Sequence, residues 1–204
     1  MGSQNLLFAA FLAFVSAERL WATRASRHAE RGQKQQAWSL PVFYVLHIAI
    51  LVSVATEYFW MRRTLVLWVT GLGMVLFGAS LLLRSWAIHT LGKFWSLHVE
   101  IREQHRLIRD GPYRYVRHPA YVAIIMEFIG IPLVGNCYYS LIPVFALFFP
   151  FLAVRILYEE RALVAKFGED YLAYRKQAGV LWPRFWVARP QPDAEGGGAL
   201  NRPR

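Results

Sequence analysis

Long blocks of apolar residues, separated by short segments rich in arginine and lysine, constrain this sequence more than any other feature. Hydrophobic residues make up 56% of the chain, and charged residues only 18%. A soluble domain distributes its apolar residues at the period of a helix or a strand, whereas blocks of this length are typical of helices that cross a lipid bilayer. The pattern predicts an all-α, polytopic integral membrane protein.

Five apolar runs define the expected transmembrane helices, at approximately residues 6–21, 40–59, 65–88, 119–134 and 138–158. Arginine and lysine are concentrated in the segments 24–34 and 89–117, and such segments stay on the cytoplasmic side of a membrane. This count of helices predicts an N-terminus outside and a C-terminus in the cytoplasm. No cation precedes the first run, as one would in a signal peptide, so we expect a retained helix.

A few polar or small residues interrupt the apolar runs. Arg84 lies near the cytoplasmic end of the third run, where we expect its side chain to reach the aqueous interface. His47, in the second run, is expected to bond a neighbouring helix rather than to act in a site. Gly71, Gly73 and Gly78 lack the strand and the spacing of a nucleotide-binding loop, so they favour close helix packing instead.

The charge and cysteine content exclude several classes of function. The net charge is +10, but the cations lie between the apolar runs, which indicates membrane topology rather than nucleic-acid binding. Cys137 is the single cysteine, so the chain has no intrachain disulfide and no multi-cysteine zinc site. The histidines lack the paired spacing of metal ligands, and we expect no metal.

We expect one membrane domain, at residues 1–188, followed by a tail. After the fifth run, apolar residues between 162 and 174 recur at helical spacing, with an interruption at Gly168, which predicts an amphipathic helix against the cytoplasmic face. Proline and glycine dominate residues 189–204, so this tail is expected to be disordered.

One short polar segment, residues 111–121, stands between the third and fourth runs. Gly111 and Pro112 predict a turn. Pro119 favours an extended conformation at His118 and can open the helix that follows. This places His118 at the mouth of a transmembrane helix, where free backbone N–H groups favour anionic ligands.

A second polar group is expected to come back to the same membrane edge. The fourth and fifth runs are joined by a tight turn at Gly135-Asn136, so they should form an antiparallel hairpin that returns Arg155, Glu159 and Glu160 to the face of His118. Arg155 and Glu159 are four residues apart and share a helix face. They form either an intrahelical ion pair or a site in which Arg155 holds an anionic substrate group and Glu159 binds hydroxyls or an amine of a cofactor.

At these residues the sequence resembles the isoprenylcysteine carboxyl methyltransferase family. The matching pieces are residues 105–108, 111–121, 155–160 and 167–174, within a family-like core at about 91–183. The resemblance implies an enzyme that uses S-adenosylmethionine without a Rossmann domain, with a pocket at the cytoplasmic edge. By matching positions, the cofactor pocket would be lined by His105, Leu107, Ile108, Tyr113, His118, Pro119, Ala120, Tyr121 and Glu159. Arg155 would face the substrate, and Arg155 and His118 would be the catalytic residues.

The reaction that follows is methyl transfer to an oxygen, preferably a carboxylate, of a lipophilic, isoprenoid-like or prenylated substrate in the bilayer. A phenolic acceptor would need a base, for which His118 or Glu160 is the candidate. Alternatives that remain open are methylation of a phospholipid amine, an NAD(P)H-dependent reductase of the sterol-reductase type, and a catalytically silent scaffold. We expect a multi-pass protein of a bacterial inner membrane with its active site in the cytoplasm; the oligomeric state stays open.

Overall fold

The structure of the protein is a computed structural model that describes residues 2–25, 33–34, 38–92, 100–101 and 107–184. The main helices are α1 (Ser3–Ala25), α2 (Ser39–Trp60), α3 (Leu67–Leu91), α4 (Pro119–Val134), α6 (Phe149–Phe167) and α7 (Glu169–Gln177). Shorter elements are the 3₁₀ helix η3 (Gly111–Arg114), the turn α5 (Leu141–Pro143), the π-helical η4 (Val144–Phe148), and the strands β1 (Gln33–Lys34) and β2 (Glu100–Ile101). The two strands pair antiparallel. His105 and the expected tail at 189–204 lie outside the described residues.

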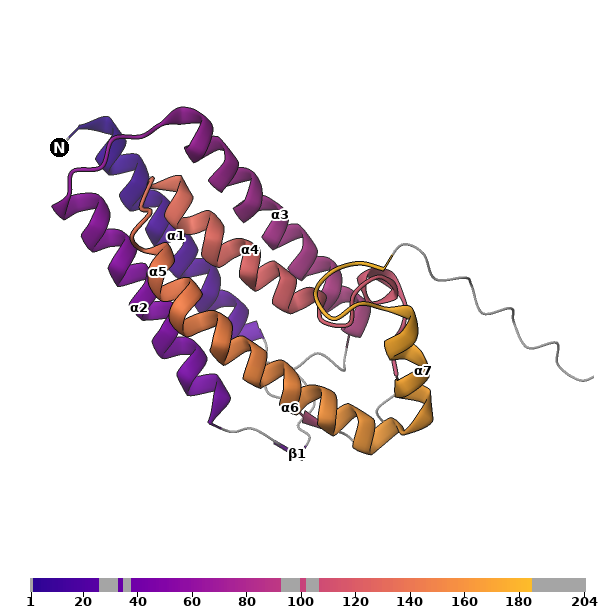
Figure 1. Ribbon diagram of the computed structural model, residues 1–204. Helices are drawn as coiled ribbons and strands as arrows, with labels where there is room; N and C mark the ends of the chain where they lie inside the picture. The colour runs from indigo at the N-terminus through magenta and orange to yellow at the C-terminus, as the bar shows by residue number, and fades with distance from the viewer. Residues whose placement is uncertain (1, 26–32, 35–37, 93–99, 102–106, 185–204) are drawn as a thin grey trace, which may run out of the picture.

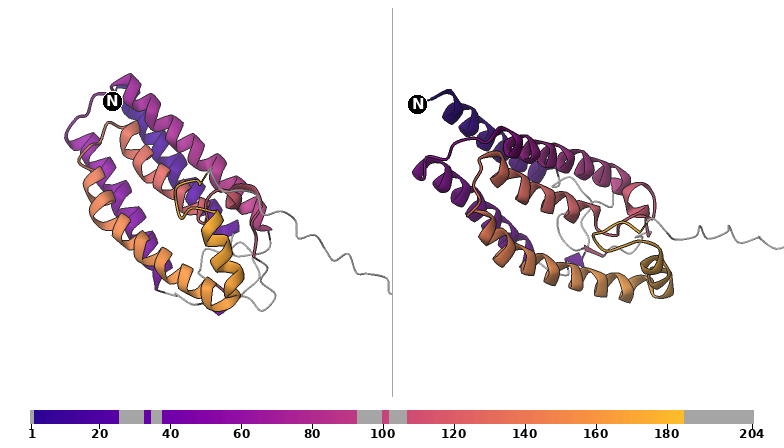
Figure 2. Two further views of the ribbon diagram at one scale, coloured as in Figure 1. Left: turned by 45° about the vertical axis from the view of Figure 1, so that its right-hand side comes forward. Right: turned by 45° about the horizontal axis from the view of Figure 1, so that its top comes forward.

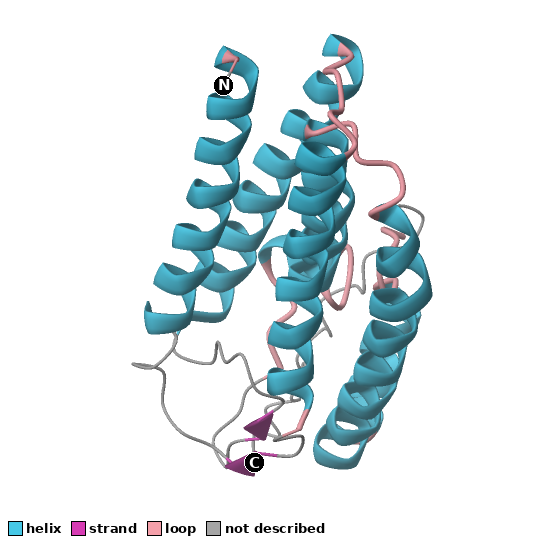
Figure 3. Ribbon diagram, turned by 90° about the vertical axis from the view of Figure 1, so that its left-hand side faces the viewer, coloured by secondary structure: helices cyan, strands magenta, loops and turns pink. Residues whose placement is uncertain are grey.

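The long helices form an elongated bundle with two distinct ends (Figures 1 and 2). At one end lie the start of α1 and the turns that join α2 to α3 and α4 to α5. At the other end α1, α3 and α6 finish, α2 and α4 begin, and η3 and α7 cover the bundle (Figures 1 and 3). We call this second end the polar end, because the cationic segments 24–34 and 89–117 begin where α1 and α3 end. All candidate site residues that the structure describes belong to it.

Three of the described helical stretches are long and apolar enough to cross a membrane: Ser39–Trp60, Leu67–Leu91 and Leu141–Phe167. The last combines α5, η4 and α6, and its π-helical turn lies between Pro143 and Pro150. α4 is apolar but shorter, and α1 carries Glu18 and Arg19 within its length. The chain is therefore an all-α integral membrane protein; five crossings and their orientation remain predictions.

Glycine permits the close approach of α3 and α4. A Cβ atom at Gly73 would lie 2.5 Å from the backbone nitrogen of Val134 and 2.8 Å from the carbonyl oxygen of Gly130. The expected close packing is therefore confirmed at Gly73. A Cβ at Gly71 or Gly78 would meet no atom within 4 Å, so at these two positions the prediction is wrong.

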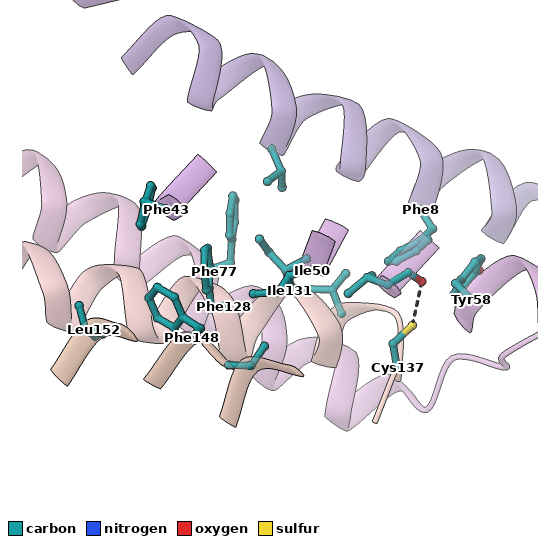
Figure 4. Close-up of a cluster of buried hydrophobic side chains, with 14 of the residues drawn as sticks. Phe8, Phe43, Ile50, Tyr58, Phe77, Phe128, Ile131, Cys137, Phe148 and Leu152 are labelled. Atoms are coloured by element: carbon teal, nitrogen blue, oxygen red, sulfur yellow. Dashed lines mark hydrogen bonds between the residues drawn. The ribbon is translucent and has the colours of Figure 1, made fainter. Parts of the chain in front are cut away.

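Aromatic side chains fill the interior between the helices (Figure 4). Phe128 of α4 and Phe148 of η4 are fully buried, with ring centroids 4.2 Å apart. Towards the other end, Phe8 of α1 lies 4.0 Å from the ring of Tyr58 of α2. Buried aromatic pairs of this kind contribute about 1 kcal/mol beyond the area that they remove from solvent. These two pairs join α4 to η4 and α1 to α2.

Four charged residues form a second, polar interior that we call the bundle cluster: Glu18, Arg19, Arg84 and Glu127. Glu127 is completely buried and accepts hydrogen bonds from Arg19 Nε, at 2.9 Å, and from Arg19 Nη2. Arg84 donates to Glu127 Oε2 at 2.9 Å and to Glu18 Oε1 at 2.5 Å. The expectation that Arg84 reaches the interface is wrong, because α1 and α4 supply two carboxylates inside the bundle; its exposed fraction is 6%.

His47 lies beside this cluster without a hydrogen-bond partner on either ring nitrogen among the described residues. Its ring instead packs on Phe43, with centroids 6.3 Å apart, and on Phe128, at 5.1 Å. The expected bond to a neighbouring helix is therefore not made. His47 is an aromatic packing residue in this structure.

Candidate active site

The polar segment before α4 has the turn and the helix start that its glycine and prolines predict, but the extended conformation expected at His118 is wrong, because its ψ of 62° lies outside the extended region. Gly111 begins η3 with a φ of +55°, a conformation that favours glycine. His118 is the N-cap of α4, with φ −125° and ψ 62°, and Pro119 is the first residue of that helix. The predicted turn and the predicted opening of the helix are both confirmed.

The backbone on either side of His118 is held by the segment that follows α7. The backbone N–H of Arg117 donates to the carbonyl of Gly179 at 2.7 Å, and that of His118 donates to the carbonyl of Val180 at 3.2 Å. The N–H of Gly179 donates in return to the carbonyl of Tyr115 at 3.2 Å. The start of α4 is therefore clamped by residues more than 60 positions later in the chain.

Glu160 of α6 organises the side chains at this end, in a set that we call the edge cluster: Arg117, His118, Glu160, Tyr171 and Arg175. Arg117 grips Glu160 through two hydrogen bonds, from Nε at 2.7 Å and from Nη2 at 3.1 Å. The Tyr171 hydroxyl donates to Oε1 at 2.8 Å, and Arg175 Nε lies 3.3 Å from Oε2. A carboxylate has about four lone-pair positions, so Glu160 is fully occupied.

Two buried tyrosines of α7 support this cluster from outside the membrane-spanning helices. Burial raises the pKa of Tyr171, and the charge of Glu160 raises it further. Burial also raises the pKa of Tyr174, whose hydroxyl donates to the carbonyl of Tyr113 at 2.6 Å. Both hydroxyls therefore stay protonated at neutral pH and act as hydrogen-bond donors.

His118 connects the edge cluster with the rest of the site. Its Nε2 lies 3.1 Å from Glu160 Oε1, and its Nδ1 lies 3.8 Å from Glu159 Oε1. If Nε2 carries the proton that Glu160 accepts, Nδ1 of the neutral ring is the acceptor. The ring stacks on that of Tyr121, with centroids 5.4 Å apart and planes at 19°. His118 is thus fixed both in its plane and at one nitrogen.

The Tyr121 hydroxyl links Arg155 and Glu159. Arg155 Nε donates to this hydroxyl at 2.8 Å, and the hydroxyl donates to Glu159 Oε2 at 2.5 Å. Arg155 Nη1 also donates to the hydroxyl of Ser39, at the start of α2, at 2.9 Å. The Tyr121 hydroxyl thus joins the two charges, and the choice between an intrahelical ion pair and a ligand site stays a prediction.

The structure therefore brings together His118, Tyr121, Arg155 and Glu159. Pro119 and Tyr113 are buried beside them; burial raises the pKa of Tyr113, and the charge of Glu159 raises it further. The remaining described candidates are half-buried: Leu107, which packs on Tyr171, Tyr174 and Ala178, and Ile108 and Ala120.

Sequence reasoning missed Ser39 as a site residue and counted Arg117 only as a topology charge. Ser39 lies outside the family-like core at about 91–183, and nothing in the sequence distinguishes a serine at a helix start that bonds a distant arginine. Arg117 directly precedes His118, and this adjacency to a candidate residue is the one signal that could have identified it.

The chemistry of these groups suits a cationic, polar ligand on one side and an anionic one on the other. Glu159 is a carboxylate with a quarter of its side chain exposed, next to a flat histidine–tyrosine stack. About one helical turn away, Arg155 presents a guanidinium that donates hydrogen bonds to the hydroxyls of Ser39 and Tyr121. Among the described residues, no group of three or more metal-ligating side chains comes together.

Comparison with known proteins connects this arrangement to one family. A profile of the isoprenylcysteine carboxyl methyltransferase (ICMT) family matches residues 71–165. The uncharacterised protein YpbQ of Bacillus subtilis (strain 168) is 30% identical over 60% of this chain and 73% of its own length. Protein-S-isoprenylcysteine O-methyltransferase of Homo sapiens is 35% identical over 61% of this chain and 45% of its own length.

A solved structure supports the same relationship. The eukaryotic intramembrane Ras methyltransferase ICMT matches with a TM-score of 0.55 and 27% sequence identity, over 69% of this chain and 52% of that chain. The chain spans about half the length of the curated methyltransferases that it matches. The matched residues 71–165 include the polar segment, α4, Arg155 and Glu159, whereas Ser39 lies outside them.

Proposed function

Because the chain belongs to the isoprenylcysteine carboxyl methyltransferase family, we propose that it transfers a methyl group from S-adenosylmethionine to a carboxylate oxygen of a lipophilic, isoprenoid-like acceptor. The observation that carries this proposal is the single linked set of Arg155, Tyr121, Glu159 and His118 at the polar end. It offers an anion-binding arginine and a cation-binding carboxylate side by side.

The residues at this end fit S-adenosylmethionine by their chemistry. Glu159 would bind its hydroxyls or its ammonium group, and the acceptor nitrogen of His118 would take a further donor. His105, Leu107, Ile108, Tyr113, Pro119, Ala120 and Tyr121 would form the remaining lining. When bound, the cofactor supplies an electrophilic methyl group, whose bond to sulfur breaks as its bond to the acceptor oxygen forms.

Arg155 would bind the carboxylate of the acceptor. A planar guanidinium grips a carboxylate through two parallel hydrogen bonds, which fixes the position of the attacking oxygen. A carboxylate of pKa about 4 is already ionised at neutral pH, so this reaction needs no general base. The chain then contributes mainly positioning and exclusion of water, which together can lower the activation free energy by up to about 10 kcal/mol.

The occupied state of Glu160 removes one of the two candidate bases for a phenolic acceptor. A phenol of pKa about 10 needs a base, and Glu160 was one of two candidates. Its oxygens are engaged by Arg117, His118, Tyr171 and Arg175. A carboxylate held in this way has no free position from which to accept a substrate proton, which leaves His118 as the candidate.

We also propose the location of the reaction. The cationic segments favour a cytoplasmic polar end by the positive-inside rule, and the similarity to YpbQ of Bacillus subtilis supports a bacterial cell membrane. The cofactor would enter from the aqueous side, while the acceptor's apolar tail would enter sideways from the bilayer.

The first test is a ligand titration of the purified protein in detergent, with S-adenosylmethionine and NADPH added separately. A ligand that binds only the folded state raises the midpoint of thermal unfolding. We expect a shift with S-adenosylmethionine alone, reduced in Glu159→Ala and retained in Arg155→Ala. A shift with NADPH alone would instead indicate a reductase.

The second test measures transfer of labelled methyl groups to lipophilic acids and to phenols of the same tail length. We expect a base-labile methyl ester on the acid, and a loss of at least about 100-fold in turnover in Arg155→Ala, typical of removing a group that positions a reactant. Labelled phenol ether without labelled ester would overturn the carboxylate assignment. Retained turnover in Arg155→Ala would overturn the role of that arginine.

A further inference from the structure

We propose that Ser39 is a positioning residue that orients Arg155 towards the acceptor's carboxylate, and so makes α2 part of the acceptor site. This inference rests on the proposed function. Ser39 is the first residue of α2 and is completely buried. It lies outside residues 71–165, the part of the chain that the family profile matches.

Arginine needs such a partner because its side chain is long and has many rotamers. In this structure two bonds from separate nitrogens orient the guanidinium of Arg155: Nε donates to the Tyr121 hydroxyl at 2.8 Å, and Nη1 donates to the Ser39 hydroxyl at 2.9 Å. The Arg155 Cζ atom also lies 5.7 Å from the centre of the Tyr121 ring. The bond to Ser39 restrains the guanidinium at a second nitrogen, in addition to the restraint that Tyr121 supplies at Nε.

A contact between Trp38 and Phe151 explains why Ser39 lies next to Arg155. Trp38, the residue before Ser39, packs edge-to-face on Phe151 of α6, with centroids 6.2 Å apart. Phe151 and Arg155 are four residues apart and so share one face of α6. This apolar contact packs the start of α2 on that face of α6. It thereby brings the hydroxyl of Ser39 within hydrogen-bond distance of the Arg155 guanidinium.

The two partners of Arg155 have different consequences for the site. Tyr121 passes a hydrogen bond on to Glu159, so it connects Arg155 with the proposed cofactor side. Ser39 comes from another helix, α2, and accepts its hydrogen bond from Nη1 of Arg155, on the proposed acceptor side. Removing the Ser39 hydroxyl should therefore weaken binding of an acidic acceptor and leave cofactor binding unchanged.

The test compares two ligands that differ only at the carboxyl group, which is charged in one and a neutral amide in the other: an N-acylated S-prenylcysteine acid and its carboxamide. Each is titrated by calorimetry into detergent-solubilised protein saturated with S-adenosylhomocysteine, which prevents turnover. We expect Ser39→Ala to weaken binding of the acid about fivefold to tenfold, as one hydrogen bond to a charged group predicts, with the carboxamide unchanged. Ser39→Thr, which keeps the hydroxyl, should restore preference for the acid.

Ser53→Ala is the matched control. Ser53 is also a serine of α2 whose hydroxyl bonds another element, at 3.1 Å from that of Ser140, but it lies far from the polar end. We expect this variant to bind both ligands like the wild type. Affinity for S-adenosylmethionine should be equal in all four proteins.

The outcomes separate this inference from the function on which it rests. If Ser39→Ala weakens acid and carboxamide equally, Ser39 only joins two helices and the inference fails. If Arg155→Ala loses the preference for the acid but Ser39→Ala keeps it, the inference again fails while the proposed function stands. A wild type that does not prefer the acid overturns the proposed function, and this inference with it.

Discussion

Glu127 and Glu160 are both buried carboxylates that an arginine grips through two hydrogen bonds, Arg19 in the first case and Arg117 in the second. Glu127 lies in the middle of α4, and its partners come from α1 and α3. Glu160 lies near the end of α6, and its partners come from the polar segment and from α7. The same type of arginine–glutamate ion pair thus occurs once between packed helices and once at the polar end of the bundle.

The difference in surroundings assigns each cluster a different role. Outside the bundle cluster itself, the buried side chains of the described bundle core are mainly aromatic and aliphatic, so a charge that loses its partner in the cluster would find few other polar groups. Around Glu160 there are backbone carbonyls and hydroxyls, and Arg117 itself also donates to the carbonyl of Ala178 at 2.5 Å. We infer that the bundle cluster holds α1 against α3 and α4, while the edge cluster sets the orientation of His118.

The largest expected effect is on stability, from Glu127→Gln. This change keeps the volume but leaves two buried arginines with Glu18 as their one carboxylate in the cluster. Breaking a buried ion pair from one side costs about 3–5 kcal/mol. The measurement is the free energy of unfolding in mixed micelles with an increasing fraction of denaturing detergent.

Two further variants make this prediction specific. Asp110→Asn removes an exposed carboxylate whose side chain caps no helix, and should change the free energy of unfolding by less than about 0.5 kcal/mol. Arg19→Met combined with Glu127→Leu removes the pair as a unit, and should be closer to the wild type than Glu127→Gln is, because apolar residues of similar volume can replace a buried pair. A double variant at least as unstable as Glu127→Gln would contradict the pairing.

A smaller effect on stability, but a larger one on binding, is expected from Glu160→Gln. Polar groups around Glu160 can re-pair with Arg117, so we expect a loss of about 2 kcal/mol, in the range of one charged hydrogen bond. His118 loses the acceptor that fixes its ring, and affinity for S-adenosylmethionine should fall on the order of tenfold. In folded Glu127→Gln protein that affinity should be unchanged. Equal loss of cofactor affinity in both variants would remove the distinction between the two clusters.

The same comparison explains what the sequence could and could not predict. Helices follow from apolar runs, and the break at Gly168 and the opening at Pro119 follow from the conformations that these residues prefer. The return of Glu159 and Glu160 to His118 follows from a tight turn at Asn136, which has a φ of +55°. Hairpin geometry is local, so part of the edge cluster could be predicted from the sequence.

The bundle cluster could not be predicted from the sequence. Arg19 and Glu127 are 108 residues apart, and helical periodicity says which face a residue occupies but not which helix covers that face. Arg84 was therefore expected at the interface, although two carboxylates meet it inside the bundle. Ser39 is a similar case, because its partner Arg155 is 116 residues away.

The smallest expected effect comes from Tyr171→Phe, which removes one hydrogen bond to Glu160 and should cost about 1 kcal/mol at neutral pH. The pKa of Tyr171 is raised in the folded protein by burial and by Glu160, so the folded state favours the neutral phenol. The contribution is complete below the unfolded pKa of about 10 and is lost as the pH rises from there towards the folded pKa. Stability should therefore fall above about pH 10 in the wild type, and less steeply in Tyr171→Phe. Tyr158→Phe, at a half-exposed position of α6, should follow the wild-type pH profile; if it also flattens the profile, the titration does not belong to the edge cluster.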